Sequence, residues 1–79
     1  MITNDNSLIL IEDIRETLQE ALSYYRTEIK KIRESKEKST DIITSETLRQ
    51  EEVKLSLKIE DIINKIDSID LYLEEVHNN

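Results

Sequence analysis

Apolar residues recur at helical spacing in two separate blocks of the chain. In the first block they are three, four or, once, seven residues apart. In the second, fours and threes alternate after an initial seven, which is the heptad spacing of a coiled-coil seam. Glu52 occupies the seam position one heptad before Ile59. Each block predicts one amphipathic α-helix; the two sets are Leu8, Ile11, Leu18, Leu22, Tyr25, Ile29 and Ile32, then Leu48, Leu55, Ile59, Ile62, Ile66, Ile69, Leu73 and Val76.

The two blocks are out of phase. Ile32 and Leu48 occupy equivalent stripe positions, yet they lie sixteen residues apart, two more than two heptads. Between them stand several Ser, Thr and Asp residues, whose short side chains cap helix ends. We therefore predict an all-α fold in a single domain over residues 1–79: an antiparallel hairpin with one helix over about 7–36, a connection over 37–44 and a second helix over 45–76. Because no glycine is present to end the first helix, one continuous kinked helix is the alternative.

The apolar stripe of the second helix is wider than one partner helix covers. Ile63 lies beside the seam, and Val53 and Leu57 lie outside it. A band of this width is typical of a helix with a further partner. We expect two hairpins to pair into a four-helix bundle as a homodimer. A helix of another protein is the second candidate for this cover.

Composition limits the chemistry that is open to the chain. Its 79 residues include no Cys, Gly, Pro or Trp and only one His, and 37% of them are charged. A thiol nucleophile and a Gly-rich phosphate loop are therefore excluded. With one His and no Cys, the chain has almost no residues from which to build a catalytic nucleophile–base pair. We expect that the protein is not an enzyme, has no catalytic residue and binds no metal or cofactor. The apolar run at residues 8–11 is too short for a signal peptide or a membrane span, which predicts a cytoplasmic protein without membrane contact.

Charge is unevenly spread along the chain. Residues 1–25 carry five acids and one base, residues 26–38 carry six bases and three acids, and residues 39–79 carry ten acids and four bases. A hairpin gathers the acids at the end with the termini, and such a surface attracts a basic partner. The leading hypothesis is a non-enzymatic interaction module: a small acidic regulator or inhibitor that binds an intracellular protein, either a basic one or a nucleic-acid-binding one whose phosphate ligand it mimics. The candidate contact residues are Tyr24, Leu57, Ile63, Leu71, Glu12, Asp13, Glu16, Glu20, Asp67, Asp70 and Glu74.

Abundant Ile, Lys and Asn with little Ala indicate an AT-rich genome, such as that of a phage or mobile element.

The basic segment supports an alternative function. A hairpin dimer resembling Rop in architecture would bind nucleic acid through Arg26, Lys30, Lys31 and Arg33 near the loop end. The overall net charge of −7 argues against general nucleic-acid affinity.

A third reading comes from residues 52–64, EVKLSLKIEDIIN. This window resembles the second helix of the small aspartyl-phosphatases of the sporulation phosphorelay, which are helical hairpins with an S-Q-E-L-D signature. Here the signature window is Ser56 to Glu60, in which only Ser56 is identical and Glu60 replaces the Asp. The resemblance implies that Glu60 would support dephosphorylation of a response-regulator aspartate.

Overall fold

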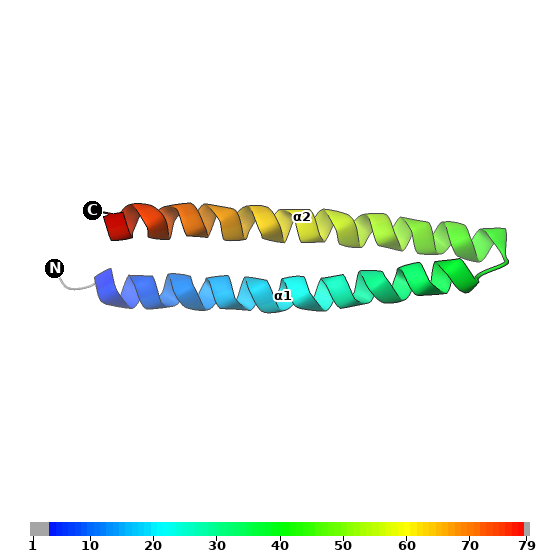
Figure 1. Cartoon of the computed structure of the whole chain (residues 1–79), viewed down its shortest axis with the longest axis horizontal. Helices are drawn as coiled ribbons and strands as arrows, with labels where there is room; N and C mark the ends of the chain where they lie inside the picture. Colours follow the sequence, from blue (N-terminus) through cyan, green and yellow to red (C-terminus); the bar gives the residue numbers. More distant parts are fainter. Residues whose placement is uncertain (1–3, 79) are drawn as a thin grey trace.

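The computed structural model describes residues 4–78, with side chains over residues 7–77. Two long helices account for almost all of it: α1 spans Asn4–Lys38 and α2 spans Ile42–Asn78. They lie antiparallel along their whole length, so that the connection is at one end of the rod and both termini are at the other (Figure 1). The rod measures 62 × 15 × 13 Å. The predicted helical hairpin is confirmed, and the single continuous helix is excluded.

The two helices meet along a narrow apolar seam. The least exposed side chains are Ile29 of α1 and Ile62 and Ile66 of α2, which retain 6%, 8% and 9% of their exposure. The other seam residues are half-buried, because each is covered by one neighbouring helix only. A two-helix rod thus has a line of contact where a larger bundle would have a core.

Polar residues that interrupt the seam pair with each other across it. The Nε of Arg15 donates a hydrogen bond to Oδ1 of Asp70 on α2. Near the loop end, the Glu52 carboxylate accepts from Nε of Arg33 and from Nζ of Lys36, each at 2.6 Å. Glu52 keeps only 17% of its side-chain exposure. The seam position that Glu52 occupies is therefore an ion-paired contact, and such contacts align one helix against the other.

The chain reverses over three residues, 39–41. The Ser39 amide donates to the Lys36 carbonyl at 3.3 Å, which tightens the last turn of α1. Asp41 then caps α2, because its carboxylate accepts from the amides of Ile43 at 3.3 Å and Thr44 at 3.4 Å. No residue from 4 to 78 has a positive φ angle, which explains how the reversal forms without glycine.

The connection is shorter than the sequence suggested. Residues 37–38 continue α1, and residues 42–44 form the first turn of α2. Asp41 and Thr44, which we had placed together in the connection, instead act as cap and third helical residue, joined by a hydrogen bond of 2.7 Å from the Thr44 hydroxyl. Within the described residues, neither helix has a stretch long and apolar enough to cross a membrane.

Candidate functional site

Two adjoining hollows form an apolar groove between the helices, in the half of the rod that holds the termini. One hollow is lined by Ile14 and Leu18 of α1 and by four residues of α2, Asn64, Lys65, Ser68 and Ile69. The other is lined by Ile11, Ser68, Ile69 and Tyr72. The two hollows share Ser68 and Ile69 and therefore form one surface feature. We call the surface lined by these eight residues the terminal groove.

Large apolar side chains project at the edges of the terminal groove. Ile14 and Tyr72 line it and remain 54% and 47% exposed. Leu10, one helical turn before Ile14, is also exposed. Single exposed apolar residues are ordinary on a protein surface, but here they adjoin a hollow of the same character. The groove is the part of the described surface best suited to receive another apolar surface.

The terminal groove lies in the acidic half of the hairpin. We define the terminal half as residues 4–22 and 58–78; it holds eleven Asp and Glu residues against three Lys and Arg residues, a net charge of −8. The remaining residues hold seven acids and eight bases, a net charge of +1. The hairpin therefore concentrates the charge of the whole chain around the groove, as the charge distribution in the sequence implied.

The acidic residues of the terminal half differ in how far they are engaged. Asp70 forms an ion pair with Arg15, and Oδ2 of Asp61 lies 2.9 Å from Nζ of Lys65. The other six acids among the candidate contact residues have exposed side chains. They are Glu12, Asp13, Glu16, Glu20, Asp67 and Glu74. Asp70 is thus the candidate acid that is paired across the two helices.

The apolar candidates from the sequence are distributed over different faces. Leu57 and Leu71 are each 62% exposed and stand fourteen residues apart on α2, which places them on the same side of that helix. Ile63 is half-buried beside the seam. Tyr24 is exposed, and its ring meets that of Tyr25 edge-on, with 5.4 Å between centroids. None of these four residues lines the terminal groove.

Sequence reasoning missed most of the groove. Ile11, Leu18 and Ile69 belong to the predicted stripes, whereas Ile14, Tyr72 and the exposed Leu10 beside the groove were not among the candidate contact residues. The available signal was their position directly beside the seam, on the side where antiparallel helices bring equivalent positions together. Ile14 and Tyr72 could have been matched in this way once the register of the two helices was known.

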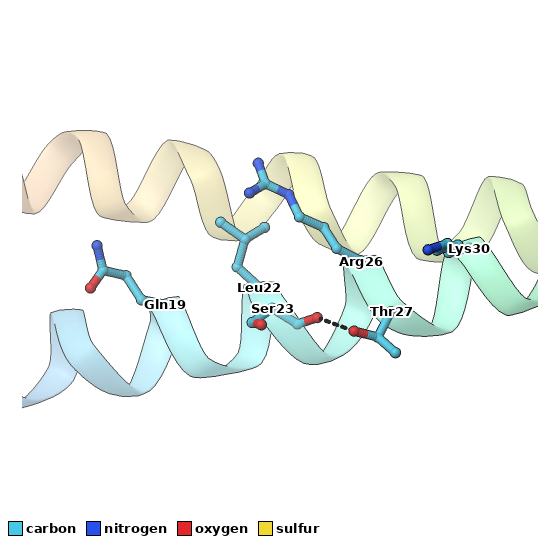
Figure 2. Close-up of a pocket in the computed structure, with 6 residues that line it drawn as sticks. All are labelled: Gln19, Leu22, Ser23, Arg26, Thr27 and Lys30. Atoms are coloured by element: carbon cyan, nitrogen blue, oxygen red, sulfur yellow. Dashed lines mark hydrogen bonds between the residues drawn. The ribbon is translucent and has the colours of Figure 1, made fainter.

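A separate hollow, on α1, is lined by two of the four basic residues that were considered for nucleic-acid binding. Its lining residues all project from α1: Gln19, Leu22, Ser23, Arg26, Thr27 and Lys30 (Figure 2). Among the described residues, no carboxylate forms an ion pair with Arg26 or Lys30. Arg33 forms an ion pair with Glu52, and Nζ of Lys31 lies 3.4 Å from Oε1 of Glu28. The four residues proposed for nucleic-acid binding are therefore not equally available.

Hydrogen bonds near the loop lower the pKa of Glu52 and of Asp41, in addition to the pKa of Glu46, which is lowered by Arg49. The hydrogen bonds from Arg33 and then Lys36 lower the pKa of Glu52 below its ordinary value, because they favour the charged form. The hydrogen bond from the Thr44 hydroxyl, followed by that from the Ile43 amide, lowers the pKa of Asp41. Both groups belong to the structural contacts near the loop, away from the terminal groove.

No protein-family model, no curated protein and no solved structure matches this chain significantly. The surface of the hairpin is therefore the guide to what the chain can bind.

Proposed function

We propose that this protein is a non-enzymatic interaction module whose working surface is the terminal half of the hairpin. The observation that carries the proposal is the coincidence of an apolar groove with a net charge of −8 in the same half of the rod. Apolar contact supplies affinity, and a concentrated charge steers a partner of opposite sign toward the surface. The module binds a basic or nucleic-acid-binding cytoplasmic protein and so inhibits or adapts it. Its abundant Ile, Lys and Asn with little Ala support an origin in a phage or mobile element.

The proposal includes pairing of two hairpins into a four-helix bundle. The accessible surface is 6242 Å², whereas a compact monomer of 9.3 kDa exposes about 5,000 Å². The excess of about 1,200 Å² is larger than the ~800 Å² that each partner contributes to a standard interface, so a second hairpin has enough surface to cover. Leu57 and Leu71 lie two heptads apart on one side of α2, with Asn64 midway between them. In this proposal, the surface that a second hairpin covers is the side of α2 that carries Leu57 and Leu71.

Two measurements test these statements separately. Sedimentation equilibrium of wild type and of a Leu57→Ser/Leu71→Ser variant measures self-association, and we expect a dimer for the wild type and a monomer for the variant. A wild-type monomer at high protein concentration would overturn the pairing. Affinity capture from cells of the source organism, with mass spectrometry, tests partner binding. We expect a basic protein that is retained by wild type and lost by an Ile14→Ser/Tyr72→Ser variant.

Arg26 and Lys30 support nucleic-acid binding as a second candidate function. They line one hollow on α1 and are separate from the ion pairs of the hairpin (Figure 2). This candidate predicts salt-dependent binding of RNA or DNA that an Arg26→Glu/Lys30→Glu variant loses. Lack of binding at low salt would remove it.

The aspartyl-phosphatase function implied by residues 52–64 also stays a prediction, and Glu60 is exposed on α2. Loss of turnover on a phosphorylated response regulator in Glu60→Ala would support it.

A further inference from the structure

The terminal groove has the dimensions of a site for one further helix. Its α1 lining residues Ile11, Ile14 and Leu18 lie three and four residues apart and span about 10 Å at ~1.5 Å per residue. The groove is therefore elongated along the rod, over about two helical turns. A third helix laid into it would contact both α1 and α2 and would present anchors at i, i+3 or i+4, and i+7. We propose that the occupant is an amphipathic helix of another protein whose apolar stripe is flanked by Lys and Arg.

The charge around the groove argues for this occupant over a second copy of the hairpin. Two terminal halves placed groove to groove would bring a net charge of −8 against −8. Packed helices lie about 8–10 Å apart, which is comparable to the screening length of about 8 Å at physiological ionic strength, so much of the repulsion would persist. A helix with basic flanks reverses the sign of this interaction. The proposal rests on the function proposed above and adds the chemistry of the partner and its place on the hairpin.

Acidic residues stand where the flanks of such a helix would lie. On α2, Asp61 and Glu75 are seven residues before and after Ser68, which lines the groove, so all three share one side of the helix. On α1, Asp13 stands three residues after Leu10 and close to it on the helix surface. Asp13 and Glu75 are exposed, and Asp61 is shared with Lys65. The partner helix would thus meet apolar groups along the groove, carboxylates of α2 beyond both ends of it and Asp13 beside its α1 edge.

Three synthetic peptides test the proposal on the full chain. All are helical and of equal length: one has a Leu stripe with Lys flanks, one has the same stripe with Glu flanks, and one keeps the Lys flanks with Ser in place of Leu. We expect the first peptide alone to bind in a titration followed by fluorescence anisotropy. Its affinity should fall as salt is raised from about 50 mM to about 500 mM, because attraction between opposite charges is screened. Equal binding of the first two peptides, or of the first and third, would overturn the proposal.

Matched variants locate the binding site. Ile14→Ser/Tyr72→Ser removes two apolar residues of the terminal groove, and Ile42→Ser/Ile43→Ser removes two that are more exposed, at the loop end of the rod. We expect the groove variant to lose roughly tenfold or more in affinity for the first peptide, and the control to bind like wild type. Equal loss in both variants would overturn the assignment to the groove, as would a groove variant that loses self-association instead. The wild-type peptide and salt comparisons hold even if the groove variant fails to fold. A partner captured from cells by another face would leave the proposed module standing and remove this inference alone.

Discussion

Arg15 on α1 forms an ion pair with Asp70 on α2, although 55 positions separate them in the sequence. The Nη2 of Arg15 reaches the second carboxylate oxygen of Asp70 at 3.4 Å, so the guanidinium faces both oxygens. Arg15 occupies the seam position between Ile11 and Leu18, where the spacing calls for an apolar residue. The pair therefore gives up apolar contact at this level of the hairpin and supplies directional contact instead.

The substitution Arg15→Leu should raise the stability of the hairpin. Partly exposed ion pairs contribute little, whereas a leucine would complete the apolar seam, and Asp70 would remain in contact with water. We expect the Tm, measured by circular dichroism, to rise by a few degrees. The matched control is Arg49→Leu, because Arg49 is exposed and pairs only with Glu46 of its own helix. A fall in Tm for Arg15→Leu would show that the ion pair stabilises more than an apolar residue does.

Stability should decrease in acid through Glu52. Its pKa is lowered in the folded hairpin, so the stabilisation by its charge is complete above the ordinary value of 4.5 and is lost as pH falls through the lower folded-state pKa. We expect Glu52→Gln to destabilise the protein at pH 7 and to flatten the dependence of Tm on pH below about 4.5. Glu51→Gln, one residue away on an exposed position, serves as the control. An unchanged pH profile in Glu52→Gln would contradict this role.

The cap of α2 depends on the side-chain oxygens of Asp41. Asp41→Ala removes the acceptor for the amides of Ile43 and Thr44, and we expect the Tm to fall by a few degrees. Asp41→Asn keeps a side-chain oxygen and should retain most of the stability. Thermal unfolding of both variants at pH 7 distinguishes a cap from a general effect of charge. Equal losses for Ala and Asn would show that the negative charge, and not the hydrogen bonding, is what matters.

The narrow seam makes its central isoleucines the most sensitive positions. Ile62 is one of the least exposed residues of the hairpin, so Ile62→Ala leaves a cavity at the seam. We expect it to cost about 3 kcal/mol in the free energy of unfolding. Val53→Ala, at a residue that is 48% exposed, should change it by less than about 0.5 kcal/mol. Urea unfolding measures both. Similar costs for the two variants would mean that the seam does not hold the hairpin together.

The hairpin could be derived from the sequence because apolar spacing and phase are local properties of the chain. The two-residue slip between Ile32 and Leu48 located the reversal, and the polar residues there do act in the turn through Ser39 and Asp41. The helix ends were misplaced by a few residues, because the choice between cap and loop for Asp41 depends on hydrogen bonds that spacing does not encode. Glu52 looked like a defect in its own helix, since its partners lie on the other helix.

The terminal groove could not be derived from either helix alone. Ile14 and Tyr72 become neighbours of one surface only after the register of α1 against α2 is fixed. The sequence therefore favoured Leu57 and Leu71, whose exposure follows from the pattern of a single helix. Surfaces built from two helices require the pairing to be known, whereas surfaces on one helix do not.

The unequal distribution of charge gives the rod a direction. A net charge of −8 at one end and +1 at the other, along a length of 62 Å, amounts to a large permanent electric dipole along the long axis. In the field of a cationic surface the molecule would turn its termini forward, and near an anionic surface it would turn its loop forward. The three-residue reversal at 39–41 therefore sets not only which residues touch, but also which end of the molecule arrives first in an encounter.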